Sequence, residues 1–240
     1  MPSACSPRSR RSSLLPRRSS APPVEKTPGI PSLEAVDLRC VRGERTLFEG
    51  LSFALKGGEL LRIGGPNGSG KTSLLRIACG LLEPDRGEVR WGGESVRRLK
   101  EEFWARLLYL GHANALKDDL TAAENLEVAC TLAGLVADGG RVGEALRSLG
   151  LAGCENLPAR VLSQGQRRRV ALARLALGGG TPLWVLDEPF TALDAAAIEC
   201  VQDLIGGHVS RGGGVIYTTH YEASIGAAVS RRIDLTGSAT

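Results

Sequence analysis

The sequence GPNGSGKT, residues 65–72, decides the fold, because it joins the apolar segment ELLRIGG to a helical run that starts at Lys71. It matches the pattern G-x-x-x-x-G-K-[ST], whose glycines let successive backbone N–H groups point into one concavity at a helix N-terminus. In this pattern the lysine reaches the β- and γ-phosphates of a nucleotide, and the Ser/Thr hydroxyl ligates Mg²⁺. An ordinary glycine-rich turn is the alternative, but it does not explain the strand and helix patterns on either side. The predicted nucleotide-binding residues are Gly65, Pro66, Asn67, Gly68, Ser69, Gly70, Lys71, Thr72 and Ser73, with Thr72 also a metal ligand.

Two adjacent acids, Asp187 and Glu188, end the strand-like segment LWVLDE at residues 183–188. A single acid at a strand end is more often a helix cap or part of a solvated turn. The pair follows the phosphate loop at a spacing that suits a second part of the same site. Asp187 is predicted to hold Mg²⁺, and Glu188 to polarise the water that attacks the γ-phosphate.

A third segment, LSQGQRRRVALARLAL at residues 162–177, places Ser163, Gly165 and Gln166 at the start of a helix. Hydroxyl and free backbone N–H groups at a positive helix end favour an anion. On its own, the segment would be an ordinary N-cap followed by a charged helix face.

These motifs, together with TALD at residues 191–194 and His220, resemble in order and approximate spacing those of ATP-binding-cassette (ABC) proteins. LSQGQ differs from the family signature LSGGQ in having Gln164 at the first glycine. The resemblance covers residues 33–240, the expected nucleotide-binding domain. It implies an α/β fold of the P-loop NTPase class, with a RecA-like parallel-sheet core, a small antiparallel β subdomain and an inserted helical subdomain.

The resemblance further implies a homodimer in which two cassettes pair head to tail around ATP and Mg²⁺. Ser163, Gly165 and Gln166 of one chain would then cap the ATP held by the phosphate loop of the other. Glu188 and His220 would be the catalytic residues, with His220 contacting the γ-phosphate. Asp194 would lie at the dimer seam.

The pattern of apolar residues predicts how the chain is organised. LEAVDLRCV and GLSFAL indicate strands of an antiparallel sheet, and the Leu/Ala-rich residues from about 96 to 165 indicate the helical subdomain. After that, helices at about 164–177 and 195–210 alternate with strands that end at Glu188 and His220. Such alternation predicts a mostly parallel sheet.

The charge distribution argues against nucleic acid as the main partner. The whole chain has a formal net charge of +4, and residues 1–32 alone carry +5. Residues 33–240 therefore have a net charge of −1, which is not the positive balance that binding to a phosphate backbone usually requires. Residues 1–32 are rich in Ser, Pro and Arg and are predicted to be disordered, as a dispensable tail, an overcalled start or an organelle transit peptide. The six scattered cysteines fit a reducing compartment, and no run approaches the roughly 18 apolar residues of a membrane span.

Two departures from the family pattern narrow the choice within it. His112 stands where family members carry a glutamine that contacts Mg²⁺ and the membrane partner. Arg42 stands where an aromatic residue stacks on adenine; a guanidinium plane can also stack on a purine, and Arg45 is a competing candidate.

With LSQGQ and ERTLFEGLSF, these departures resemble the haem exporter ATPase subunits of cytochrome c biogenesis. That resemblance implies a peripheral position on the cytoplasmic face of the bacterial inner membrane, with integral membrane permease subunits (CcmB-like and CcmC-like) as partners. ATP hydrolysis would drive release of a haem-loaded chaperone, and no direct haem binding by this chain is expected. The alternatives are the ATPase of another ABC transporter, a non-transport ABC ATPase and, last, a small-molecule kinase.

Overall fold

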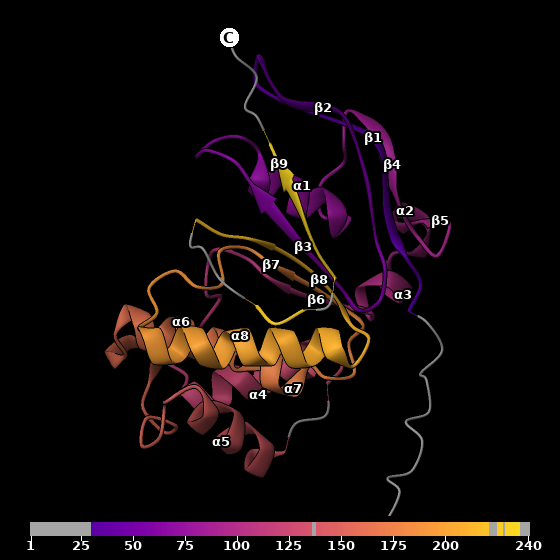
Figure 1. The fold of residues 1–240 in the computed structure, drawn as a ribbon. Helices are drawn as coiled ribbons and strands as arrows, with labels where there is room; N and C mark the ends of the chain where they lie inside the picture. The colour runs from indigo at the N-terminus through magenta and orange to yellow at the C-terminus, as the bar shows by residue number, and fades with distance from the viewer. Residues whose placement is uncertain (1–29, 136–137, 221–224, 228, 236–240) are drawn as a thin grey trace, which may run out of the picture.

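The computed structural model describes residues 30–135, 138–220, 225–227 and 229–235, so nearly all of the predicted extension at residues 1–32 lies outside the described part. The described residues form two sheets with helices packed around them (Figure 1). The first sheet is antiparallel, in the order β2-β1-β4-β5. Its strands are β1 (Leu33–Arg42), β2 (Arg45–Leu55), β4 (Arg86–Trp91) and β5 (Glu94–Ser95). This confirms the predicted antiparallel subdomain.

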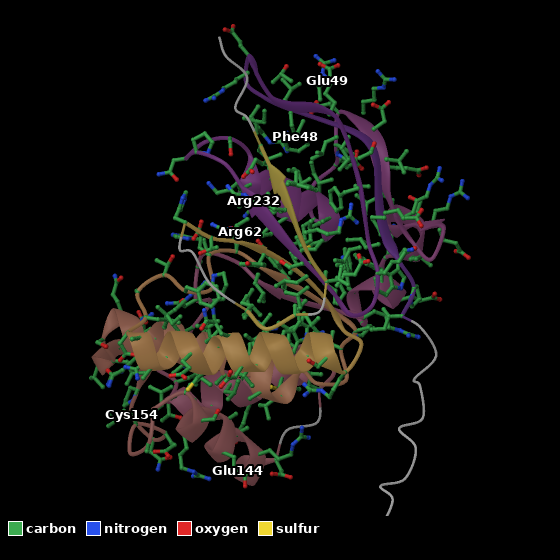
Figure 2. The ribbon with its side chains drawn as sticks, viewed as in Figure 1. Phe48, Glu49, Arg62, Glu144, Cys154 and Arg232 are labelled. Carbon is green, nitrogen blue, oxygen red and sulfur yellow. The ribbon has the colours of Figure 1, made fainter. Side chains whose placement is uncertain are left out.

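The second sheet is parallel throughout and has the order β6-β7-β8-β3-β9. Its strands are β3 (Glu59–Gly64), β6 (Leu107–Leu110), β7 (Leu183–Leu186), β8 (Gly214–Thr218) and β9 (Val229–Asp234). Arg62 of β3 lies beside its register partner Arg232 of β9 (Figure 2). Every residue of β7 and β8 is buried, as expected for central strands covered on both faces. The carboxyl ends of these strands meet at one edge, where Asp187, Glu188 and His220 follow.

The parallel sheet separates two hydrophobic clusters. Leu60 of β3 packs with α8 (Ala195–Ser210) and the inserted helices, whereas its neighbour Leu61 packs with α1 (Lys71–Ala78) and the antiparallel sheet. This alternation follows from the two-residue period of a strand. The insertion, where Glu144 and Cys154 are found, lies at the other end of the molecule from Phe48 and Glu49 of the antiparallel sheet (Figure 2).

The helical insertion is shorter than predicted. After α2 (Val96–Leu99) and α3 (Glu101–Trp104), residues Leu107–Leu110 form β6, an edge strand of the parallel sheet. The prediction of a helical subdomain from residue 96 onward is therefore wrong for Leu107–Leu110. The run Leu-Leu-Tyr-Leu is too short for a period to be recognised, and leucine favours helices. The insertion comprises α4 (Ala122–Leu132), α5 (Gly139–Ser148), η1 (Ala159–Val161), α6 (Gln164–Leu172) and α7 (Arg174–Leu177).

Burial of His208 should make the stability of the fold depend on pH. His208 of α8 is 3% exposed and stacks on Trp184 of β7, with ring centroids 3.8 Å apart. Burial lowers the pKa of His208 from 6.5 to about 4. Between these values the unfolded chain binds a proton that the folded chain does not, so stability is complete above the unfolded pKa and falls as pH drops through the folded pKa. The expected loss is about 3 kcal/mol.

The measurement is urea unfolding of the wild type and of His208→Phe between about pH 7 and about pH 4. Phenylalanine preserves the aromatic stack and removes the titrating group. We expect a steeper loss of the unfolding free energy with acidification in the wild type. Parallel pH profiles for the two proteins would contradict the assignment.

Candidate functional site

The phosphate loop between β3 and α1 requires glycine at its two ends. Gly65 and Gly70 have φ values of 134° and 98°, in a region that side chains rarely adopt. A Cβ on Gly65 would lie 2.6 Å from the Leu235 carbonyl oxygen, and one on Gly70 would lie 3.0 Å from the Leu47 Cβ. Larger residues at either position would therefore displace the loop.

Lys71, the first residue of α1, lies beneath this loop. Its Nζ donates hydrogen bonds to the carbonyl oxygens of Gly65, at 2.9 Å, and Pro66, at 3.0 Å. The side chain is only 8% exposed. The loop thus curves around a cation, which is the arrangement needed to bind polyphosphate.

Asp187 and two threonines form a hydrogen-bonded network at the strand ends. Thr72 Oγ1 donates to Asp187 Oδ2 at 2.9 Å, and Thr218 Oγ1 donates to Asp187 Oδ1 at 2.7 Å. The Thr72 hydroxyl and the Asp187 carboxylate supply the oxygen donors that Mg²⁺ prefers. The residues present therefore fit a magnesium ion bound next to phosphates.

Sequence reasoning did not identify Thr218. Its hydroxyl also accepts a hydrogen bond from the Glu188 backbone N–H at 2.9 Å, so it fixes both acids of the site. The sequence carries only a partial signal: Thr218 lies near the end of a predicted strand, but its partner Asp187 can be assigned only once β8 is known to lie beside β7.

Glu188 combines an unusual backbone with contacts to His220. Its φ is 50°, in the left-handed region that costs a non-glycine residue about 1–3 kcal/mol. The His220 backbone N–H donates to Glu188 Oε2 at 3.2 Å, and His220 Nε2 lies 3.4 Å from Glu188 Oε1. The carboxylate is thus held against the side chain predicted to act with it.

These groups surround one cavity of about 490 Å³, within the range typical of small-molecule sites. His112 is among its lining residues, whereas Arg42 is not. Arg42 instead donates to the adjacent Val41 carbonyl oxygen, and Arg45 Nη1 lies 3.9 Å from where a Cβ on Gly68 would stand. Of the two arginines considered for adenine stacking, Arg45 is the one that approaches the loop. The lining residues are Leu47, Asn67, Gly68, Gly70, Lys71, Thr72, Ser73, His112, Asp187, Glu188, Thr191 and His220.

The residues predicted to act on a second chain do not line this cavity. Ser163 and Gln166 form a capping box at the start of α6, with the Gln166 N–H donating to Ser163 Oγ and the Ser163 N–H donating to Gln166 Oε1. A Cβ on Gly165 would lie 2.9 Å from the Ala192 carbonyl oxygen. Asp194 caps α8 by accepting a hydrogen bond from the Ala197 N–H at 2.9 Å. Their action in trans stays a prediction.

No helix in the described part of the chain is both long and apolar enough to cross a bilayer.

The cavity, with a cation beneath a glycine loop, a carboxylate–threonine pair and an adjacent glutamate, can hold a nucleoside triphosphate with Mg²⁺ and activate a water beside it.

Comparison with known proteins agrees with this chemistry. Residues 48–191 match the family model described as ABC transporter. The chain is 52% identical over 207 residues to the cytochrome c biogenesis ATP-binding export protein CcmA of Nitrosospira multiformis, covering 86% of this chain and 100% of that protein. It is 49% identical to the protein of the same name from Salmonella typhi, covering 85% and 97%.

Solved structures are similar as well. A putative ABC transporter ATP-binding protein from Pyrococcus furiosus matches with a TM-score of 0.71 and 26% identity, covering 84% of this chain and 96% of that one. A dimeric bacterial ABC transporter cassette matches with a TM-score of 0.70 and 28% identity, covering 79% and 88%. On the family match and the extent of these similarities, the chain belongs to the ABC transporter family of ATPases and, within it, to the CcmA type.

Proposed function

We propose that this chain is the ATP-hydrolysing subunit of a membrane export complex in cytochrome c biogenesis, and that it powers release of a haem-loaded chaperone. The observation that carries the ATPase part is the convergence of Lys71, Asp187, Glu188 and His220 on one cavity. The names of the curated relatives support the pathway. Haem itself would be handled by the membrane partners rather than by this chain.

The geometry supports a division of labour among the cavity residues. Lys71 contacts the β- and γ-phosphates, and the backbone N–H groups of the loop bind their oxygens. Thr72 and Asp187 would hold a magnesium ion, which when bound would neutralise charge on the phosphate oxygens. Glu188 orients and polarises a water, whose oxygen bonds to the γ-phosphorus as the bond to the bridging oxygen breaks. The products are ADP and phosphate, and the proton of the water passes to the Glu188 carboxylate. His220 lies next to Glu188 and contacts the γ-phosphate.

Completion of the site requires a second copy of the chain. Ser163, Gly165 and Gln166 begin helix α6 away from their own cavity, so their hydroxyl and backbone N–H groups are available to a γ-phosphate held by a partner copy. Asp194 lies at the end of the segment between β7 and α8, where it caps α8, and would lie at the seam between the two copies.

An apolar groove provides the proposed docking surface for a cytoplasmic helix of the permease. This groove, about 400 Å³ in volume, lies between α3, β6, α4, α6 and α7. Four of its lining residues are unusually exposed for their type: Leu132 is 84% exposed, Leu81 52%, Val128 46% and Trp104 45%. An exposed apolar patch of this kind marks an interaction surface. Such a partner would hold the chain on the cytoplasmic face of the inner membrane.

Leu132→Asp is expected to reduce co-purification with the permease from detergent-solubilised membranes by about 30-fold, the loss that corresponds to a hot-spot residue of about 2 kcal/mol. Nucleotide binding by the isolated chain should be unchanged, because Leu132 is not among the residues that line the nucleotide cavity. Val229→Asp is the matched control: Val229 is 45% exposed and lies on β9, at the opposite edge of the parallel sheet. Equal recovery of both variants would contradict the assignment of the groove.

The identity of the co-purified membrane proteins tests the pathway. Recovery of cytochrome c maturation proteins would support the proposal. Recovery of a peptide or sugar permease instead would show that the chain serves a different ABC transporter.

A further inference from the structure

A buried arginine links the start of α6 to the hydrolysis site. Arg168 lies one turn into α6, in a run of three arginines that by sequence suggests a solvated face, yet it is only 5% exposed. Its Nη2 donates to the carbonyl oxygens of Asp187, at 2.9 Å, and Glu188, at 2.8 Å. Its Nη1 donates to the Gly111 carbonyl oxygen at 3.2 Å and to Asn114 Oδ1 at 3.3 Å.

One guanidinium therefore joins three segments that are far apart in sequence: α6, the turn after β7 and the loop after β6. The planar fork suits this task, because its two terminal nitrogens carry four N–H groups, one for each acceptor. An ammonium group has its donors on a single atom and cannot reach both pairs of acceptors. The Nε of Arg168 has no hydrogen-bond partner among the described residues, so the bonds at the two terminal nitrogens hold the group in place.

The bonds to Asp187 and Glu188 go to their backbone carbonyls, which leaves the two carboxylates available for the metal and for water. Burial lowers the pKa of Arg168, and the nearby charges of Asp187 and Glu188 oppose that shift. Because a guanidinium stays protonated in proteins, Arg168 places a positive charge behind the acids, with hydrogen bonds directed at their main chain.

Glu188 needs such a contact because of its backbone. With φ at 50°, its left-handed conformation persists only if the surroundings enforce it. Thr218 Oγ1 accepts from its N–H at 2.9 Å, and Arg168 Nη2 donates to its carbonyl oxygen at 2.8 Å. The two peptide groups of Glu188 are thus fixed from opposite sides, one by β8 and the other by α6.

The second pair of bonds reaches the loop that carries His112. Gly111 and Asn114 flank that residue, which lines the nucleotide cavity, and Asn114 also lines the apolar groove. A displacement of α6 relative to the parallel sheet would therefore act on both the groove and the Glu188 backbone.

From this geometry we propose that Arg168 is a positioning residue, which sets the Glu188 backbone for hydrolysis and transmits the orientation of helix α6 to it. The inference rests on the proposed ATPase function. It predicts that loss of the guanidinium lowers kcat by about 10- to 100-fold, the effect of misplacing a reacting group by about 1 Å or of removing an outer-shell partner. KM and nucleotide affinity should change less than about threefold, because Arg168 does not line the phosphate site.

The test compares Arg168→Met and Arg168→Lys with the wild-type full chain by steady-state ATPase kinetics, binding of a fluorescent ATP analogue and thermal unfolding. Arg167→Met is the matched control, since Arg167 lies beside Arg168 on α6 but contacts Asp118 and the Ala159 carbonyl oxygen. Arg168→Lys retains the charge and most of the bulk. If Arg168→Met does not fold, the turnover of Arg168→Lys tests the proposal instead. Arg168→Lys should also lose turnover, because an ammonium group lacks the two terminal nitrogens of the guanidinium.

A double variant separates positioning from a general structural defect. If Arg168 acts through Glu188, adding Arg168→Met to Glu188→Gln should lower the residual rate by less than about threefold, although each change alone lowers it much more. Multiplicative losses would overturn the proposal, as would equal losses in Arg167→Met and Arg168→Met, or loss of nucleotide binding together with turnover. A wild-type chain without ATPase activity would instead refute the proposed function, so the two failures are distinguishable.

Discussion

Glu188→Gln is expected to bind ATP as tightly as the wild type while losing turnover by about 10²- to 10⁴-fold, the range associated with a general base. Glutamine has the same shape and retains an oxygen that can accept the hydrogen bond from the His220 N–H, now 3.2 Å from Glu188 Oε2. It lacks the negative charge that polarises the attacking water. The phosphate loop and Lys71 are untouched, so affinity should not fall.

Single-turnover ATP hydrolysis and equilibrium binding of a fluorescent ATP analogue measure the two effects separately. If two copies close around ATP, the variant should also remain dimeric in ATP for longer than the wild type, which size-exclusion chromatography would detect. Glu199→Gln, on α8 outside the cavity, controls for removal of an acid. Hydrolysis by Glu188→Gln at the wild-type rate would mean that another group activates the water.

The parts of the fold that sequence predicted are those in which a contiguous pattern has one physical explanation. The predicted helix at 195–210 coincides with α8, whose first turn is capped by Asp194. The phosphate loop was recognisable because the backbone at Gly65 and Gly70 leaves no room for a side chain. Glycine is therefore required at these two positions, and their fixed spacing is visible in the sequence. Likewise, Asp187 and Glu188 stand out because two acids directly follow a wholly buried strand.

The parts that sequence did not predict depend on contacts between distant segments. Thr218 is recognised as a ligand of Asp187 only when β7 and β8 are known to be neighbours. Arg168 looks like its neighbours in sequence, and its burial arises because α6 packs over the ends of β6 and β7. Strand β6 was missed because four residues carry too little periodicity to outweigh the helical preference of leucine.

The two departures from the family pattern at His112 and Gln164 lie in different parts of the structure. His112 lines the cavity beside the phosphate loop, so an imidazole faces the site where family members carry a glutamine. Gln164 is exposed in the first turn of α6, and the capping box at this helix end is formed by Ser163 and Gln166 rather than by Gln164. The first departure lies in the predicted nucleotide cavity, whereas the second leaves in place the N–H groups that are predicted to bind an anion.

Lys71→Ala is expected to lower ATP affinity by about 100-fold, because the variant lacks charge-assisted hydrogen bonds worth about 1.5–3 kcal/mol each. In the structure the Lys71 ammonium already donates to the Gly65 and Pro66 carbonyl oxygens, so the same change also removes the internal support of the loop. Both effects act in the same direction on nucleotide binding. Neither acts on the hydrophobic clusters on the two faces of the parallel sheet.

Binding of the fluorescent ATP analogue, read beside thermal unfolding, separates these contributions. Lys56→Ala, at an exposed lysine after β2, should bind ATP normally and controls for the lost charge. Since Lys71→Ala is expected to weaken binding and Glu188→Gln to impair only the chemical step, the two variants should differ in affinity by about two orders of magnitude while both lose turnover. Equal affinities in the two variants would mean that the ammonium beneath the loop serves the loop alone, and that the phosphates are held by the backbone N–H groups.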